Sequence, residues 1–314
     1  MFSVIIPVYN GATFIDTAIE SVFKQSFTDW EIVIVNDGSS DNTADVLKKY
    51  EADPRITVYT QDNAGVSIAR NNGITASKGS HIVFLDADDV WHNNHLEVMY
   101  SLIKKYPDAG MYGTFTRTEL VNGEIIEECN YFKNRDTEVY TKDFFKEYYL
   151  DKSAKMFTVI TTCFSRNALD VAGLFSVGCA IGEDLELSLR VAAYFPVVLS
   201  PKATATYKKV NSTATKDRSF DPDWKFFDSV NELYEDNRIS NDKKENLKKI
   251  MQWFTMRRSR HYIIDGRKKD AYCAYKNIGN DPRLRKDKLI TAILLILPVC
   301  FVKWLFLNRW RGRA

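Results

Sequence analysis

The chain contains few cysteines and no motif built from them. Its 314 residues include five cysteines at scattered positions and no Cys-x-x-Cys pair. A disulfide framework or a structural zinc site needs closely spaced cysteine pairs, so both are disfavoured. An odd number of widely spaced cysteines fits a protein from a reducing compartment.

Two common nucleotide-binding motifs are absent as well. Neither G-x-G-x-x-G nor G-x-x-x-x-G-K-[ST] occurs, which disfavours a Rossmann dehydrogenase and a P-loop NTPase. There is no internal repeat and no low-complexity segment. Hydrophobic residues make up 45% and charged residues 27%, which argues against a disordered chain, a collagen or a multi-span membrane protein. The first seven residues lack a basic region and predict a strand, not a signal peptide.

The net charge of +2 conceals a strong asymmetry along the chain. Residues 1–242 carry 24 basic and 36 acidic side chains, whereas residues 243–314 carry 19 basic and five acidic ones. The acidic part is suited to a cation, and the basic part to an anionic surface such as phospholipid or nucleic acid. A nucleic-acid partner is not expected, because no nucleic-acid-binding fold accompanies the charge.

Short apolar segments alternate with helical patterns in the first half of the chain. Strands are expected at 3–8, 31–36, 56–60 and 81–85, with helices at 14–23, 41–50 and 66–77 between them. This alternation predicts an α/β fold with a doubly wound, mostly parallel sheet flanked by helices. Ligands of such sheets bind at the carboxyl ends of the strands.

The second half is less regular. We expect a helix from after residue 89 to before Pro107, strands at 109–120 and 159–164, a helix at 183–193, and a strand pair at 197–198 and 203–207. A turn is expected at Asn122-Gly123, and the rest of 121–155 has no clear pattern. Beyond Asp221 the sequence is helical and rich in charge to about Lys269.

Acidic residues follow two of the expected strands. Asp37 begins the segment Asp-Gly-Ser-Ser-Asp, and Asp86, Asp88 and Asp89 lie within four residues. Carboxylates this close repel one another unless a cation or hydrogen-bond donors offset the charge. An oxygen-only cluster favours Mn²⁺ or Mg²⁺ over zinc. Either loop alone is equally well explained by Asx turns and helix caps, but both together at strand ends favour a ligand site.

Five segments together carry a family resemblance. They are residues 4–10 (VIIPVYN), 35–43 (VNDGSSDNT), 63–73 (NAGVSIARNNG), 84–89 (FLDADD) and 182–187 (GEDLEL). In order and spacing they resemble family 2 glycosyltransferases of the GT-A fold, over about residues 1–215. The resemblance implies transfer of a sugar from a nucleotide-diphosphate donor, commonly a UDP-sugar, to a hydroxyl of a glycan or lipid-linked acceptor, with inversion and a divalent metal.

The resemblance also implies a role for several donor-site residues. Tyr9 would stack on the base, and Pro7 would shape the strand end beneath it. Asp37 would accept a hydrogen bond from the base, and Arg70 would contact the nucleotide. These roles suit the side chains, because an aromatic ring can cover a base and a carboxylate can accept from an imide N–H.

The remaining implied roles belong to acidic residues. Asp86 would approach the ribose and diphosphate, and Asp88, with Asp86, would hold Mn²⁺ or Mg²⁺. Asp184 would be the general base that deprotonates the acceptor hydroxyl, with Glu183 as the alternative base. Both acids also suit the first turn of a helix for purely electrostatic reasons, and the sequence does not separate them.

The chain departs from the family in two places. Many members carry a histidine after the tyrosine of the last strand, whereas residues 207–212 read YKKVNS, with Val210 among them. One metal ligand therefore has no candidate, and the Lys208-Lys209 pair is either a diphosphate contact or solvated surface. The Gln-x-x-Arg-Trp signature of processive members is also missing, because Gln252 is followed by WFTM. Single-sugar transfer is expected instead of polymer synthesis.

The C-terminal segment is apolar and basic. Residues 289–302 are almost wholly apolar, and as one helix through Leu307 the 19 residues would span about 28 Å. Pro298 and Lys303 make it a poor bilayer span, whereas flanking basic residues and tryptophans suit an interfacial or re-entrant anchor. A helix buried against the core or a dimer partner is the alternative. We expect a cytoplasmic enzyme peripherally attached to the cytoplasmic face of the membrane.

Three regions are expected: a glycosyltransferase domain at 1–215, a helical basic extension at 216–284 and a membrane-associating tail at 285–314. Two other functions stay open. A nucleotidyltransferase also pairs an α/β domain with Mg²⁺, but Asn10-Gly11-Ala12 is a poor version of its phosphate loop. A membrane-bound sugar-binding module without catalysis is the second. The oligomeric state, the donor sugar and the linkage are not determined by the sequence.

Overall fold

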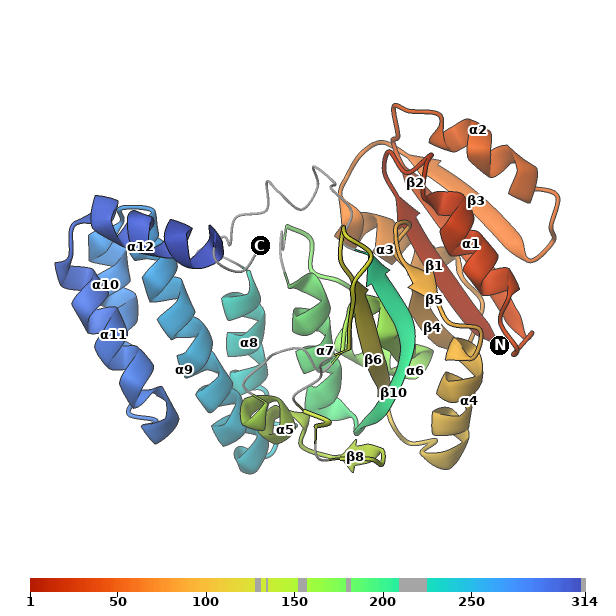
Figure 1. Cartoon of the computed structure of the whole chain (residues 1–314). Helices are drawn as coiled ribbons and strands as arrows, with labels where there is room; N and C mark the ends of the chain where they lie inside the picture. Colours follow the sequence, from red (N-terminus) through yellow and green to blue (C-terminus); the bar gives the residue numbers. More distant parts are fainter. Residues whose placement is uncertain (128–130, 134, 152–156, 179–181, 209–224, 312–314) are drawn as a thin grey trace.

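The protein is described by a computed structural model covering residues 1–127, 131–133, 135–151, 157–178, 182–208 and 225–311. Figure 1 shows a twisted sheet in one half of the molecule and a stack of helices in the other. The strand order along the main sheet is β3-β2-β1-β4-β9-β6-β10-β5.

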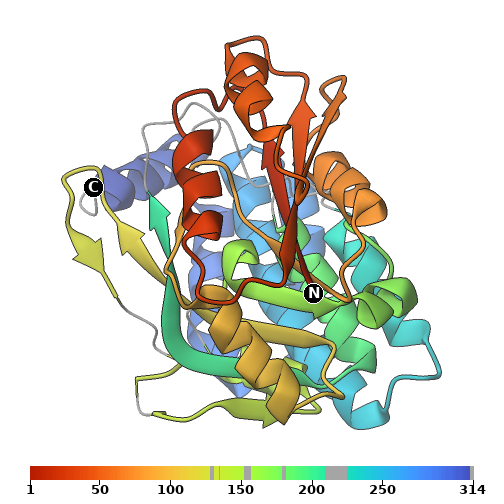
Figure 2. The same cartoon turned by 90° about the vertical axis from the view of Figure 1, so that its right-hand side faces the viewer.

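The amino-terminal half forms the predicted parallel sheet. β1 (Phe2–Val8) lies between β2 (Trp30–Asp37) and β4 (His81–Phe84), and β3 (Ile56–Gln61) extends the sheet beyond β2. All seven residues of β1 are buried, as expected for a strand covered on both faces. α1 (Ile15–Phe23) and α3 (Val66–Ala76) lie on either side of these strands (Figure 2). The fold therefore confirms the expected α/β architecture.

The other half of the sheet is mixed. β9 (Thr162–Ser165) runs antiparallel to both β4 and β6 (Met111–Glu119), and β10 (Val197–Lys208) runs parallel to β6. Consequently β6 and β10 point in the same direction as β1, and their carboxyl ends lie at the same edge. Short strands complete the sheet: β5 (Val90–Trp91), β7 (Ile125–Ile126) and β8 (Val139–Thr141).

Two strand predictions are wrong in detail. The expected pair at 197–198 and 203–207 is one continuous strand, β10, whose register with β6 shifts between Leu199 and Ala203. Pro201 lies within this bulge, where a missing N–H costs no ladder hydrogen bond, so the proline does not end the strand. The expected strand at 159–164 begins instead with a 3₁₀ turn, η2 (Val159–Thr161), which Thr158 caps.

Helices cover the sheet and extend beyond it. They are α2 (Thr43–Leu47), η1 (Lys48–Tyr50), α4 (His95–Lys105), α5 (Phe144–Leu150), α6 (Arg166–Ala172) and α7 (Glu183–Tyr194). Then follow α8 (Phe226–Glu235), α9 (Asn241–Ile264), α10 (Lys268–Lys276), η4 (Pro282–Leu284), α11 (Arg285–Ile296) and α12 (Val299–Arg311). The core of the sheet continues into α8 and the first half of α9, through Phe226 and Phe254.

The apolar C-terminal segment is not one helix. It is divided between α11 and α12, and the break falls at Leu297-Pro298, where proline cannot continue the helical hydrogen bonds. Leu294 and Val302 pack in a second core with Tyr262 and Ile263 of α9. Among the described helices, none has both the length and the hydropathy to cross a membrane.

Candidate active site

The predicted site residues lie at the edge of the sheet where β1, β2 and β4 end. Tyr9 follows β1, Asp37 is the last residue of β2, and Asp86 lies just beyond β4. Because these strands are parallel and adjacent, their following loops are neighbours at this edge.

The loops after β1 and β2 are fastened together. Asn10, in a left-handed conformation with φ of 51°, accepts a hydrogen bond from the Ser40 amide at 2.8 Å. Asp41 accepts from the amide of Ala12 and from Thr43. Although burial opposes the effect, these hydrogen bonds hold the pKa of Asp41 below its ordinary value. The rim of the site is thus held by polar contacts made within it.

Asp37 organises the next loop. Its buried carboxylate accepts from the Gln61 side chain at 2.8 Å and from the amides of Ala64 and Gly65 at 2.8 and 2.9 Å. Gly38 has φ of +71°, and a Cβ there would approach the Asn63 nitrogen to 2.7 Å. The predicted base contact by Asp37 therefore has to share a carboxylate that already accepts three hydrogen bonds.

Tyr9 and Pro7, near the end of β1, differ in their exposure to solvent. The Tyr9 side chain is 55% exposed, so its ring is available to a ligand, whereas Pro7 is buried. The Leu85 amide donates to the carbonyl of Ile5, so the backbone polar groups of Ile5 face β4. The backbone of Pro7, two residues later in the strand, faces the same side. β4 ends at Phe84, which pairs with Ile5, so Pro7 lies beyond the last pair and its missing N–H costs no ladder bond.

Arg70 joins the donor-side loop to α7. Its two terminal nitrogens donate to Asp86 at 2.8 Å and to Glu183 at 2.9 Å, and the side chain is only 3% exposed. Burial alone would lower the pKa of Arg70, but the two carboxylates raise it. The guanidinium also lies over the Phe175 ring, 5.4 Å from its centroid. Segments more than 100 residues apart in sequence are therefore connected by one buried cation.

Asp184 and Glu183 have different environments. Glu183 is buried and paired with Arg70, whereas Asp184 is partly buried and accepts a hydrogen bond from the Leu185 amide at 2.8 Å. Burial, followed by the negative charge of Glu183, raises the pKa of Asp184 to about 6, although Arg70 acts in the opposite direction. A carboxylate with a pKa near neutrality is suited to accept a proton.

Asp89 is a residue whose role the sequence analysis missed. It is 1% exposed, and one oxygen accepts from the Lys208 amide at 2.9 Å. Its second oxygen is buried with no partner among the described residues. Burial, then the charges of Asp86 and Asp88, raise its pKa to about 9. Asp89 is therefore a neutral anchor between this loop and β10; the adjacent apolar Val90-Trp91 was the available signal that it points inward.

Asp86 and Asp88 suit a divalent cation only if a bound ligand supplies further oxygen atoms to it. Asp86 and Asp88 are both partly buried in the loop after β4. Nowhere in the described ranges do three or more His, Cys, Asp or Glu residues gather as a possible metal site. Two carboxylates with diphosphate oxygens and water form the coordination that Mg²⁺ and Mn²⁺ commonly accept. Lys209 and Val210, which follow β10, lie outside the described residues.

Residues 3–170 match the sequence profile of the family described as Glycosyl transferase family 2. The chain therefore belongs to the family 2 glycosyltransferases, which confirms the predicted family and enzyme class.

Three relatives share 27–37% of the aligned residues with parts of this chain. Poly(ribitol-phosphate) beta-N-acetylglucosaminyltransferase TarP of Staphylococcus aureus is 27% identical over 245 residues, 74% of this chain and 70% of TarP. WfgD of Escherichia coli, a UDP-Glc:alpha-D-GlcNAc-diphosphoundecaprenol beta-1,3-glucosyltransferase, is 37% identical over 127 residues, 40% of this chain and 49% of WfgD. The matched segment spans only 23% of GlyA from Streptococcus pneumoniae, which is 32% identical over 51% of this chain.

Solved structures share the fold. TarS residues 1–349 of S. aureus, in complex with UDP-GlcNAc, aligns with a TM-score of 0.71 and 18% identity, covering 98% of this chain and 91% of that one. A mannosyltransferase of Pyrobaculum calidifontis, in complex with GDP-Man and Mn²⁺, aligns with a TM-score of 0.60 and 17% identity, covering 96% and 82%. At these identities the likeness establishes the GT-A-type fold.

We predict that replacing Arg70 by methionine destabilises the protein by about 3–5 kcal/mol. Two carboxylates, one of them buried, would lose their shared cation. Urea unfolding followed by circular dichroism measures the change. Arg55→Met, which removes an exposed arginine paired with Asp53, is the control and should change stability by less than about 1 kcal/mol. Equal effects of the two variants would show that the buried bridge is not a special source of stability.

Proposed function

We propose that this enzyme transfers one sugar from a UDP-sugar to a hydroxyl of a glycan or lipid-linked acceptor, with inversion at the sugar carbon. The observation that carries the proposal is the ion-pair bridge through Arg70. It ties Asp86, on the donor side, to Glu183, the residue next to Asp184. A base beside the donor loop is what a direct displacement requires.

The exposed ring of Tyr9 and the donors of two relatives indicate which donor the enzyme prefers. Tyr9 offers an exposed aromatic face at the end of β1, beside the buried carboxylate of Asp37. TarS was solved with UDP-GlcNAc, and WfgD is named for a UDP-glucose donor. We infer a uridine nucleotide with its base at Tyr9 and its diphosphate toward Asp86 and Asp88. Arg70, being buried, would act on the nucleotide through Asp86.

Asp184 is the better candidate for the base. Glu183 is buried and its carboxylate accepts from Arg70 at 2.9 Å, so it is less accessible to an acceptor hydroxyl. Asp184 has a raised pKa and is charged above pH of about 6. It would remove the proton of the acceptor hydroxyl as the oxygen attacks the sugar carbon from the face opposite the diphosphate. One attack from that face inverts the anomeric configuration.

A divalent ion would be held by Asp88 and Asp86. Bound there, Mn²⁺ or Mg²⁺ supplies positive charge to the departing diphosphate. The neighbouring Asp89 is neutral because its pKa is raised to about 9, so the loop presents two carboxylates and not three. This lowers the repulsion that the donor diphosphate would meet.

The C-terminal helices offer a surface for an anionic membrane. Leu289, Ile293 and Ile296 are exposed at helical spacing along α11, and Phe301 and Trp304 are exposed on α12. Basic residues lie near this apolar face in sequence: Arg285, Lys286 and Lys303. Exposed apolar residues flanked by lysine and arginine favour binding at a lipid interface. We propose peripheral attachment through this face, close to lipid-linked acceptors.

We predict that kcat/KM for transfer falls about tenfold per pH unit below pH of about 6 and is level above it. The folded pKa of Asp184 is raised, so protonation, and with it loss of the base, begins near that pH. Transfer is measured as UDP release in the presence of acceptor extract from cell envelopes. A rate that is flat down to pH 5 would contradict the assignment.

The matched variants are Asp184→Asn and Glu183→Gln. Asp184→Asn should bind the donor normally and lose transfer by about 10²–10⁴-fold, the usual range for a general base. Glu183→Gln should keep a single pH limb, because Asp184 is still present, but the limb should move below pH 6, because the charge of Glu183 helps to raise the pKa of Asp184. Exchange of these two phenotypes would assign the base to Glu183.

We predict that donor binding requires both a divalent ion and Asp88. In calorimetric titrations, UDP-GlcNAc or UDP-glucose should bind with Mn²⁺ and weaken at least about tenfold with EDTA. Asp88→Ala should weaken binding in Mn²⁺ to the level that EDTA gives. The control is Asp45→Ala, which removes an exposed aspartate on α2 that pairs with Lys48. Full binding in EDTA would contradict the metal requirement.

Membrane binding predicts flotation with vesicles. The protein should float with phosphatidylglycerol-rich vesicles and much less with phosphatidylcholine, and high salt should reduce binding. Replacing Ile293 and Ile296 by glutamate should abolish flotation. Val121→Glu, at a 65% exposed valine on the turn between β6 and β7, should leave it unchanged. Flotation of the double variant like the wild type would rule out this face.

A further inference from the structure

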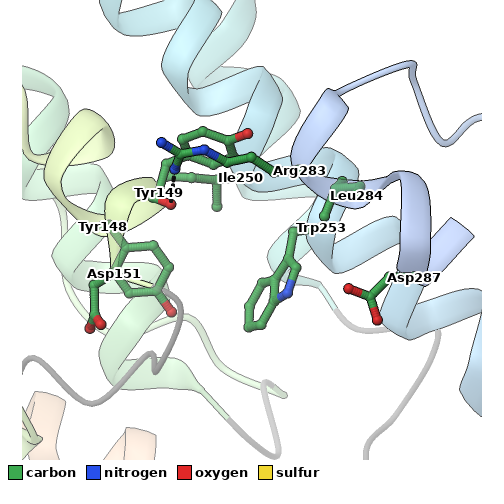
Figure 3. Close-up of a pocket in the computed structure, with 8 residues that line it drawn as sticks. All are labelled: Tyr148, Tyr149, Asp151, Ile250, Trp253, Arg283, Leu284 and Asp287. Carbon is green, nitrogen blue, oxygen red and sulfur yellow. Dashed lines mark hydrogen bonds between the residues drawn. The ribbon is translucent and has the colours of Figure 1, made fainter. Parts of the chain in front are cut away.

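A cavity of about 190 Å³ lies between α5, α9 and the η4–α11 segment. Figure 3 shows side chains from all three entering it. The lining residues are Tyr148, Tyr149, Asp151, Ile250, Trp253, Arg283, Leu284 and Asp287. No role above uses this cavity, and no sequence motif indicated it, because its walls come from three distant parts of the chain.

Aromatic and aliphatic side chains form part of the floor and walls. Ile250, Leu284 and Tyr148 are buried, and Trp253 stands between α5 and α11 in Figure 3. Arg257, which is not a lining residue, lies 4.9 Å from the centre of the Trp253 ring and holds it in place. The Trp253 indole N–H makes no hydrogen bond within the described part of the chain. The indole therefore offers both a flat apolar surface and an N–H donor.

Charged groups of both signs surround this aromatic surface. Asp151 and Asp287 supply carboxylates, and Arg283 supplies a guanidinium that lies 4.7 Å from the Tyr149 ring centre. Asp287 is itself paired with Arg260 at 3.0 Å. Balanced charge disfavours an anion, and the carboxylates disfavour a lipid tail. Carboxylates that accept from hydroxyls beside an aromatic ring that covers C–H groups match a neutral sugar.

The size of the cavity suits a small ligand. Its volume of about 190 Å³ is room for one sugar ring. The ring of Trp253 and the floor residue Ile250 belong to adjacent turns of α9, a 24-residue helix, so the platform is rigid.

The cavity adjoins the proposed base. α5 packs against both α7, which carries Asp184 in its first turn, and α9, which carries Trp253. Tyr148 of α5 lines the cavity, and burial raises the pKa of its hydroxyl, with Arg257 acting against this and Asp184 adding to it. α5 thus connects the cavity to the helix that carries the proposed base.

We propose that this cavity binds one neutral monosaccharide unit of the acceptor, with Trp253 as the stacking platform. The proposal rests on the proposed transferase function and adds the acceptor's chemical class and the residues that select it. Arg283 and the two aspartates would bind hydroxyls of that unit, so they are specificity residues. The unit held here would orient the acceptor chain toward Asp184.

Saturation-transfer NMR with the full-length protein tests the proposal. The probes are methyl β-glucopyranoside, methyl N-acetyl-β-glucosaminide and methyl β-galactopyranoside. At least one should receive saturation from the protein, and Trp253→Ala should weaken that binding at least tenfold. Trp304→Ala, which removes an exposed tryptophan of α12 outside the cavity, is the matched control and should bind normally. Arg283→Ala, at an exposed position, should weaken binding severalfold.

Hydrolysis of UDP-GlcNAc or UDP-glucose without acceptor separates the two proposals. All three variants should keep the wild-type hydrolysis rate, because the cavity does not hold the donor. If the wild type hydrolyses donor but no glycoside binds, or if Trp253→Ala and Trp304→Ala bind equally well, the acceptor cavity is overturned alone. If the wild type hydrolyses neither donor, the proposed use of these UDP-sugars fails instead.

Discussion

The site depends on one buried cation. Arg70 reaches from α3 to the loop after β4 and to the first residue of α7, and it binds a carboxylate in each. A buried arginine needs such partners, and the buried Glu183 needs a cation, so these two groups justify each other's burial, while Asp86 stays partly exposed. The bridge therefore links the start of α7 to the loop at the sheet edge.

The acidic residues of the site differ in burial and in partners. Glu183 is buried and paired with Arg70, whereas Asp184, one residue later, has a pKa raised mainly by burial. In the loop after β4, Asp89 is buried and its pKa is raised, while Asp86 and Asp88 lie closer to solvent. These differences are how one loop can both anchor itself and receive a ligand.

Much of the first half of the fold could be predicted from the sequence. The strands around residues 3–8 and 31–36 are apolar and β-branched, and their pattern depends on local properties that the sequence carries directly. By contrast, the continuity of β10 through Pro201 depends on its partner β6, and the choice between Asp184 and Glu183 depends on Arg70, 113 residues away. The cavity at Trp253 was also beyond prediction, because it exists only where three remote segments meet.

The resemblance predicts which residues form the site but not their partners. Asp37 is expected to bind the nucleotide base, and the structure shows that it holds the loop at 61–65 by three hydrogen bonds. Motifs record which side chain is needed, whereas the network that positions it is a property of the packed chain.

The length of α9 has a consequence for how the enzyme meets its acceptor. Its 24 residues rise about 36 Å, with the first half embedded in the main core and the second half supporting α11 and α12. A straight helix anchored at both ends acts as a spacer of fixed height. If its far end rests on a bilayer, the catalytic edge lies at a fixed height above the lipid. The length of an acceptor, as well as its chemistry, then determines whether it reaches the site.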